Sequence, residues 1–171
     1  RRKLSSLDKP LIAMIRGYCL GGGLSVAMSA DIRIASEDAQ LGIPAARLGI
    51  AYGYESLEQL VNLVGPSFAK EILFSARRFS AEEALRIGLV NRVVPVDELG
   101  DAVCEMAATI ASNAPLSVKA TKITVAEVLK DPPTRNLEAI EQIVKICFDS
   151  QDYAEGRQAF IEKRKPRFNG R

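Results

Sequence analysis

The feature of the sequence best suited to chemistry is a glycine-rich turn, Gly17-Tyr-Cys-Leu-Gly-Gly-Gly23, which precedes a short apolar segment. Consecutive glycines permit unusual backbone angles and a close approach of another molecule to the main chain. At the start of a helix they also leave amide N–H groups without an internal acceptor. Such amides can bind a negative oxygen, either of a phosphate or of an oxyanion that develops during a reaction. A tight strand-to-helix turn with packing glycines explains the same residues equally well.

Two familiar motifs are not satisfied by this turn. It matches neither the phosphate-binding pattern GxxxxGK[ST] nor the dinucleotide-binding pattern GxGxxG. The segment Gly23-Leu-Ser-Val-Ala27 superficially resembles the GxSxG turn of serine hydrolases, but the chain contains no histidine to activate Ser25. We therefore interpret Ser25 as a small helix residue packed beneath the turn.

The composition excludes several classes of function. The absence of histidine removes an imidazole general base, a Ser-His-Asp triad and a histidine-ligated metal, and we expect no metal site. Cys19, Cys104 and Cys147 are far apart and odd in number, which predicts no disulfide framework and favours a reducing compartment. The 23 Lys plus Arg residues barely exceed the 21 Asp plus Glu residues, so no nucleic-acid-binding face is expected.

Membrane and targeting signals are also missing from these 171 residues. No apolar run approaches the roughly 18 residues of a membrane span, and no apolar stretch of a signal peptide follows the basic start. We therefore expect a cytoplasmic protein without a membrane partner. The chain also lacks an initiator methionine, which suggests a processed or truncated piece.

The elements that must position the glycine turn follow from the spacing of apolar residues and helix breakers. The order of short apolar runs and helical stripes predicts an α/β fold. Gly65-Pro66 separates two helical stripes, and Ser80-Ala-Glu-Glu83 has the pattern of a capping box. The expected strands are 11–15, 32–35, 41–43 and 89–94, and the expected helices are 24–30, 57–64, 68–76, 80–88, 99–110, 116–130 and 137–147.

The C-terminal tail carries five positive charges between Lys163 and Arg171 and no acidic residue. A solvated helix end, where cations complement the helix dipole, is the simpler interpretation. A phosphate-binding patch is the alternative.

Taken in order, these segments resemble the enoyl-CoA hydratase/isomerase (crotonase) family. The resemblance covers nearly the whole chain and is carried by 9–13, 17–23, 27–31, 42–44, 48–49, 80–84, 88–91 and 159–166. It implies a ClpP/crotonase-like spiral of ββα turns in residues 1–115 and a helical region in residues 116–171 that serves trimerisation and caps coenzyme A. It also implies that roughly the first third of a family-length chain is missing.

The same resemblance assigns the ligand and its contacts. The substrate is an acyl-CoA thioester, with coenzyme A as part of the substrate and no tightly bound cofactor. The Gly22 amide donates to the thioester oxygen, and the second donor lies in a loop before the Lys9 strand that these residues lack. Leu20, Phe160 and Lys163 contact coenzyme A, the last two from a neighbouring subunit of a trimer or a dimer of trimers.

The positions of the family's two glutamates are occupied by Ser25 and Ala45, which cannot transfer a proton as a carboxylate does. Hydration of an enoyl-CoA would then need a substitute such as Glu55, which can equally be a carboxylate that complements a helix dipole. Tyr52 occupies the position of a tyrosine in the methylmalonyl-CoA decarboxylase branch, which residues 48–52 and 149–165 also resemble. A packed aromatic residue is the simpler explanation of Tyr52. An enoyl-CoA hydratase, an acyl-CoA decarboxylase and a non-catalytic acyl-CoA-binding homologue remain open.

Overall fold

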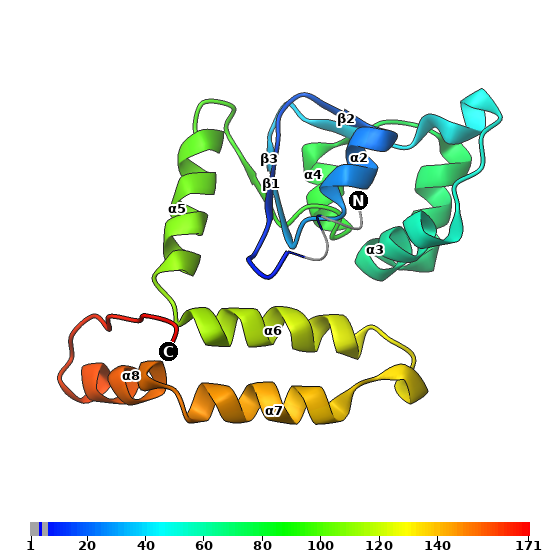
Figure 1. The fold of residues 1–171 in the computed structure, drawn as a ribbon. Coiled ribbons are helices and arrows are strands. Elements are labelled where there is room, and N and C mark those ends of the chain that lie inside the picture. Colours follow the sequence, from blue (N-terminus) through cyan, green and yellow to red (C-terminus); the bar gives the residue numbers. More distant parts are fainter. Residues whose placement is uncertain (1–3, 5–6) are drawn as a thin grey trace. The chain divides into compact units, whose positions relative to one another are not determined.

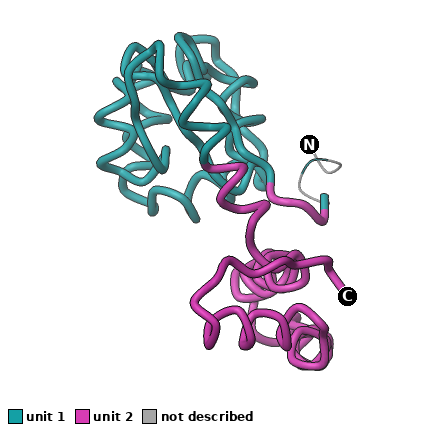
Figure 2. Tube along the Cα trace, turned by 90° about the vertical axis from the view of Figure 1, so that its left-hand side faces the viewer, with its two compact units in different colours: residues 1–7, 11–105 teal, residues 8–10, 106–171 magenta. Residues whose placement is uncertain are grey.

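A computed structural model describes residue 4 and residues 7–171 of the chain. The chain forms two compact units, which Figure 2 colours separately. Unit 1 contains the described residues up to 105 apart from 8–10, and unit 2 contains residues 8–10 and 106–171. The boundary falls within helix α5 (Leu99–Ala111). None of the helices in the described part of the chain is both long and apolar enough to cross a bilayer.

Unit 1 is built on two small sheets, and the first four strands alternate between them along the chain (Figure 1). The first sheet has the order β1 (Ile12–Ile15), β3 (Ile32–Ser36), β6 (Arg92–Val94), and all its strands are parallel. The second has the order β2 (Tyr18–Leu20), β4 (Gln40–Gly42), β5 (Phe79–Ser80), with β5 antiparallel to β4. Parallel neighbours require long connections, which in this unit contain the helices.

The helices of unit 1 begin and end at residues with clear local roles. They are α2 (Gly22–Ala27), the 3₁₀ helix η1 (Pro44–Leu48), α3 (Tyr54–Ser75), α4 (Ala81–Arg86) and the start of α5. Helix α3 consists of two helical segments joined at Gly65, whose φ of 74° breaks the helix before Pro66, as the sequence predicts. The predicted capping box also forms, because Ser80 Oγ accepts the Glu83 N–H and the Glu83 carboxylate accepts the Ser80 N–H.

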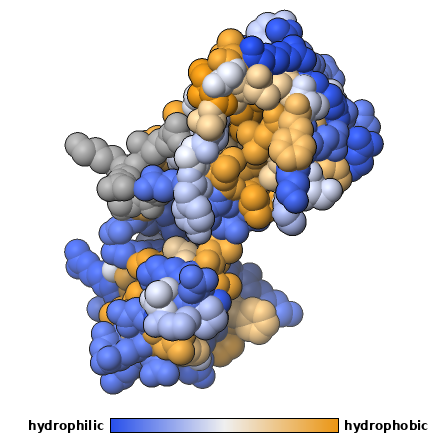
Figure 3. Space-filling view, turned by 90° about the vertical axis from the view of Figure 1, so that its right-hand side faces the viewer, coloured by the Kyte–Doolittle hydropathy of each residue, from blue (hydrophilic) through white to orange (hydrophobic). Residues whose placement is uncertain are grey.

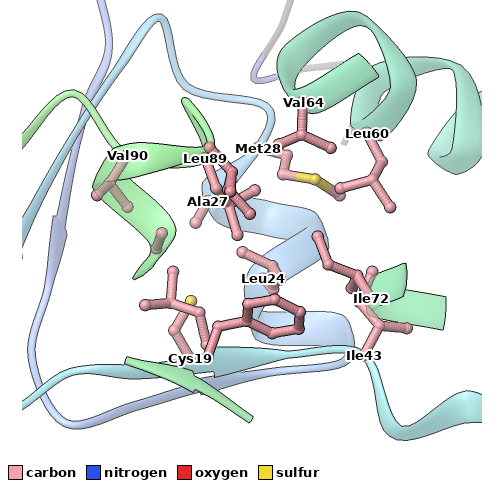
Figure 4. Packing of buried hydrophobic residues seen from close by; sticks show 14 of the residues in the cluster. Cys19, Leu24, Ala27, Met28, Ile43, Leu60, Val64, Ile72, Leu89 and Val90 are labelled. Carbon is pink, nitrogen blue, oxygen red and sulfur yellow. The ribbon is translucent and has the colours of Figure 1, made fainter. Parts of the chain in front are cut away.

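The core of unit 1 surrounds helix α2. Leu24 is fully buried and Met28, just after the helix, is nearly so. Figure 4 shows both side chains among Leu60 and Val64 of α3 and Leu89. Burying these side chains removes apolar surface from water and fixes the helix. The core therefore fixes the helix that follows the glycine turn.

Unit 2 is a helical unit with a folded-back tail. It contains α6 (Pro115–Val128), the 3₁₀ helix η2 (Pro132–Thr134), α7 (Leu137–Phe148) and α8 (Gln151–Ile161). The buried Asp152 carboxylate accepts the N–H groups of Asn169 and Gly170 at 2.7 and 2.9 Å. Glu155 accepts hydrogen bonds from the Arg164 guanidinium and the Arg167 N–H, which lower the pKa of Glu155 to about 2. Part of the basic tail is therefore tied to acidic residues of α8.

Several elements differ from the sequence prediction, in which α8 and the short elements β5, η1 and η2 have no counterpart. Strand β2 is not predicted, because its three residues stand between glycines in a pattern that is typical of a turn. The helix expected at 24–30 begins earlier, at Gly22, and ends at Ala27. Tighter turns follow it, in which the Ser29 and Ala30 N–H groups donate to carbonyls three residues earlier. The strand expected at 89–94 is reduced to β6, because the Leu89 and Val90 amides donate to the Ala84 carbonyl and close the end of α4.

Gly42 provides a test of this packing. A Cβ atom at this buried position would lie 2.7 Å from the Arg77 carbonyl oxygen, so either the end of β4 or the loop that carries Arg77 between α3 and β5 must shift. We expect Gly42→Ala to lower the free energy of unfolding in urea by about 1–3 kcal/mol through overpacking. Gly100→Ala in α5 is the matched control, because a Cβ atom there meets nothing within 4 Å. Replacing a helical glycine by alanine should raise the free energy of unfolding by about 0.5–1 kcal/mol. Equal stability of the two variants would contradict the close contact.

Candidate functional site

The triple-glycine turn is pinned at its first residue. Gly21 adopts φ 53° and ψ −115°, a conformation that only glycine enters readily. Its N–H donates to the Gly42 carbonyl at 2.8 Å, and its own carbonyl accepts the Ser25 N–H at 3.0 Å. Both polar backbone groups of Gly21 are therefore used within unit 1, and the turn is joined to the end of β4.

The next two glycines are open. Gly22 and Gly23 are exposed, and a Cβ atom on either would meet nothing within 4 Å. Among residue 4 and residues 7–171, neither amide N–H finds a hydrogen-bond acceptor. The half-buried Gly21 thus holds two unoccupied donors, the Gly22 and Gly23 amides, at the surface. This arrangement can accept an oxygen that carries negative charge, because fixed donors need no rearrangement when the charge develops.

Ser25 and Ala45 both lie in the interior of unit 1. Ser25 is fully buried on α2, and within the described residues its hydroxyl oxygen has no hydrogen-bond partner. Ala45 is buried on η1. Neither side chain carries an ionisable group, and the Ser25 hydroxyl is shielded from solvent. This favours the interpretation of Ser25 as a packed helix residue over that of a nucleophile.

Tyr52 is brought to the turn by the fold. Its half-buried ring packs against the core, and its hydroxyl oxygen lies 3.7 Å from the position of a Cβ atom on Gly21. Tyr54, by contrast, is exposed and donates its hydroxyl hydrogen bond to Glu58 at 2.9 Å. Glu55 is exposed in the first turn of α3, where a carboxylate complements the helix dipole. Of these three residues, Tyr52 is the one with a contact at the glycine turn.

The turn opens onto a shallow depression. This depression has a volume of about 260 Å³ and is lined by residues of β1, β2 and α2, with Gly23 and Val26 among them. Cys19 also lines it, but burial raises the pKa of its thiol, so the reactive thiolate is disfavoured. Leu20 is half-buried at the end of β2, immediately before the turn. Further hydrophobic side chains are exposed elsewhere on unit 1, one face of which Figure 3 shows.

The candidate coenzyme contacts of unit 2 lie at the end of α8. The side chain of Phe160 is 86% exposed and borders a largely apolar cavity of about 580 Å³, together with Phe148, Tyr153 and Phe168. Lys163 is exposed and adopts a left-handed backbone conformation, with φ 53°, just after the helix. Arg164, the next residue in the tail, instead forms ion pairs with Glu155 and Glu162.

Sequence reasoning missed the residues that hold these groups in place. In the sequence Gly42 is only one residue of a short motif, and nothing there shows that its carbonyl accepts the Gly21 N–H. Asp152 follows a helix-capping serine and reads as an ordinary first-turn carboxylate, although it binds backbone amides of the tail. In the part of the chain that the structure describes, no cluster of three or more His, Cys, Asp or Glu side chains is suited to a metal ion.

Comparisons with known proteins agree on one family. The sequence matches the model of the enoyl-CoA hydratase/isomerase family over residues 1–171. It is 43% identical over 164 residues to a short-chain-enoyl-CoA hydratase of Clostridium acetobutylicum and 40% identical over 167 residues to a crotonyl-CoA hydratase of Syntrophomonas wolfei. These matches cover 96% and 98% of the chain but 63% and 64% of the relatives. The chain therefore spans less than two thirds of their length.

The structure has similar neighbours among solved proteins. It resembles an enoyl-CoA hydratase/carnithine racemase from Magnetospirillum magneticum with a TM-score of 0.93 at 37% sequence identity. That match covers 99% of this chain and 63% of the other. The similarity in structure thus extends over nearly all of the 171 residues.

The two fully buried serines of unit 1 provide a test of the site. Because the Ser25 hydroxyl is buried without a partner, Ser25→Ala should raise the free energy of unfolding by about 1 kcal/mol. Ser36 is the matched control, since its hydroxyl bonds the Ile15 carbonyl and the Asp38 carboxylate, and Ser36→Ala should lower stability. Urea unfolding measures both. A large loss of stability in Ser25→Ala would show that its hydroxyl is bonded after all.

Proposed function

The chain belongs to the enoyl-CoA hydratase/isomerase family, and we propose that it acts on acyl-CoA thioesters by binding the thioester oxygen at the Gly22 amide. Its fold is crotonase-like. The observation that carries the proposal is the pair of exposed amides at Gly22 and Gly23, which have no acceptor among the described residues. Coenzyme A enters as part of the substrate, and the proposal needs no tightly bound cofactor.

The chemistry proposed for the turn is electrostatic. When a proton or a carboxylate leaves the carbon next to the thioester, its electron pair moves onto the carbonyl oxygen and forms an enolate. A backbone N–H aimed at this oxygen stabilises the charge most in the transition state, where the charge develops. The Gly21–Gly42 hydrogen bond fixes the turn before the substrate binds. A second donor is expected from a loop outside these 171 residues.

Hydration of an enoyl-CoA is the first candidate reaction. It is favoured by the names of the two relatives, a short-chain-enoyl-CoA hydratase and a crotonyl-CoA hydratase. The reaction needs a group that activates water and returns a proton, and neither Ser25 nor Ala45 can do so. Glu55 is the carboxylate proposed to replace them. It is exposed at the start of α3, two residues beyond the loop that carries Tyr52.

Decarboxylation of a methylmalonyl-CoA-type substrate is the second candidate, and the position of Tyr52 favours it. In this reaction the bond between the α-carbon and the carboxylate breaks, carbon dioxide leaves, and the electron pair forms the enolate. A weak acid then returns a proton to the α-carbon, so no carboxylate base is required. The Tyr52 hydroxyl beside Gly21 can orient the leaving carboxylate.

Unit 2 is proposed to bind coenzyme A and to assemble the protein. Phe160 can stack on an adenine ring, and Lys163 can pair with a phosphate. Unit 2 also exposes many large hydrophobic side chains, which is typical of a surface that another chain covers. They include Val125, Val128, Leu129, Leu137, Ile146, Phe148 and Ile161. We propose a homo-oligomer, either a trimer or a dimer of trimers, that acts in the cytoplasm.

Replacing Gly22 tests the proposed oxygen site. Gly22 has room for a side chain, so Gly22→Val should fold, but its branched side chain would shield the amide. Loss of one oxyanion donor lowers kcat by about 100- to 1,000-fold. Gly100→Val is the matched control, because Gly100 also lies in the first turn of a helix with open space around it. If Gly22→Val consumes the acyl-CoA substrate at the same rate as the unchanged protein, the Gly22 amide is not the donor to the thioester oxygen.

Tyr52 separates the two candidate reactions. Incubation with crotonyl-CoA and with methylmalonyl-CoA, followed spectrophotometrically, shows which thioester is consumed. If Tyr52 orients the leaving carboxylate, Tyr52→Phe should slow consumption of methylmalonyl-CoA by about 100-fold, the loss expected when a reacting group is misplaced by about 1 Å. Tyr54→Phe, which removes an exposed hydroxyl bonded to Glu58, should have no effect. Binding of both thioesters without turnover would instead identify a non-catalytic acyl-CoA-binding homologue.

A further inference from the structure

The turn that ends α8 places a lysine where helices favour glycine. The Lys163 N–H donates to the Phe160 carbonyl at 3.3 Å, and the Arg164 N–H donates to the Ala159 carbonyl at 3.0 Å. Helices that end with this pair of hydrogen bonds have a left-handed residue just after the helix, which is usually glycine. Lys163 has the required φ of 53°, although a side chain makes this conformation unfavourable. Among the non-glycine residues that the structure describes, only Ala76 shares a positive φ.

An unfavourable backbone conformation persists only where the surrounding structure holds it, and such residues gather at sites that bind ligands. The side chain of Lys163 is exposed, and among the described residues it has no hydrogen-bond or ion-pair partner. No contact in this part of the chain therefore accounts for a lysine at this position. Its ammonium group is available to a ligand that carries negative charge.

The residues just after Lys163 are fixed by Glu155 of α8. The Glu155 carboxylate accepts two parallel hydrogen bonds from the Arg164 guanidinium, at 2.6 and 2.9 Å, a geometry that is both strong and directional. It also accepts the Arg167 N–H at 2.7 Å. Because these contacts, the Arg164 hydrogen bonds foremost, lower the pKa of Glu155 to about 2, the carboxylate is ionised at neutral pH.

The far end of the tail is held on the same helix. The Asp152 carboxylate, 2% exposed, accepts the Asn169 and Gly170 N–H groups. Asp152 and Glu155 are three residues apart and therefore lie on one face of α8. One helix face thus binds the tail at two places. Of the two carboxylates, Glu155 is the one that contacts the residue next to Lys163.

We propose that Glu155 is a positioning residue: by fixing Arg164 and Arg167 it holds Lys163 in the left-handed conformation that presents its ammonium group to a phosphate. The inference deepens the function proposed for unit 2 and rests on it, because the phosphate is that of coenzyme A. Glu155 itself does not touch the ligand. Its effect on binding passes through the backbone of the turn.

Hydrogen exchange on the whole 171-residue chain tests whether Glu155 holds the turn. Glu155→Gln removes the charge that binds Arg164 and should speed exchange of the Lys163 and Arg164 amides at least about tenfold, since their hydrogen bonds open more often. Glu127→Gln is the matched control, because Glu127 likewise binds a lysine side chain and a backbone N–H in unit 2. This control should leave exchange of the two amides unchanged.

A second background separates positioning of Lys163 from general stability of the tail. Lys163→Gly removes the side chain that disfavours the turn, so the left-handed conformation should form without help. In this background Glu155→Gln should speed exchange of the Arg164 amide by less than about twofold. An equal effect of Glu155→Gln in both backgrounds, or no effect in either, overturns the proposal.

Calorimetric titration tests what the positioning serves. Glu155→Gln should weaken binding of coenzyme A about tenfold and leave binding of pantetheine, which carries no phosphate, unchanged. Glu127→Gln should bind both probes as the unchanged protein does. If Glu155→Gln binds coenzyme A as tightly as the unchanged protein, Glu155 does not position a phosphate contact. If the unchanged protein does not bind coenzyme A, the ligand proposed for unit 2 is wrong, and the exchange comparison still decides whether Glu155 holds Lys163.

Discussion

The hydrogen bond from the Gly21 amide to the Gly42 carbonyl is the constraint on which the proposed site depends. It joins the end of β2 to the end of β4 and holds a backbone conformation that a side chain would resist. Leu24, one turn further along α2, is fully buried and fixes the other end of the same short segment. Between these two anchors, Gly22 and Gly23 remain exposed. Their amides are therefore held in position without being used by the fold.

The two compact units are stabilised in different ways. Unit 1 has a contiguous apolar core drawn from both sheets and from helices α2 to α4. Unit 2 buries few large apolar side chains and relies on polar contacts of its tail, in which Asp152 and Glu155 bind backbone and guanidinium groups. A helical unit with so much exposed apolar surface gains stability when another surface covers it. This difference agrees with a catalytic role for unit 1 and an assembly role for unit 2.

The proposed replacement of both glutamates by Ser25 and Ala45 would limit the chemistry and leave the proposed oxygen site in place. Ser25 and Ala45 are buried and cannot carry a proton, whereas backbone donors do not depend on side-chain identity. Stabilisation of an enolate can thus persist while the group that delivers protons changes. Tyr52 is the side chain that the fold brings to the turn, with its hydroxyl oxygen 3.7 Å from the position of a Cβ atom on Gly21.

Local patterns in the sequence were sufficient for several elements. The capping box at Ser80, the break at Gly65-Pro66 and helices α6 and α7 follow from nearest neighbours in the chain, and the order of short motifs indicated the family. The sequence did not reveal strand β2, the early start of α2 or the end of α4 at Leu89, because each depends on a hydrogen bond or packing contact chosen in three dimensions.

The sequence by itself determined the residue types of the candidate site: three glycines in a row, no histidine, and Ser25 and Ala45 where the family resemblance predicts glutamates. Only the tertiary structure decided that Gly42 pins Gly21, that Tyr52 reaches the turn and that Asp152 binds the tail. The physical reason is that these contacts join residues far apart in the chain. Their formation depends on the packing of β4, α2 and α8, which no local pattern encodes.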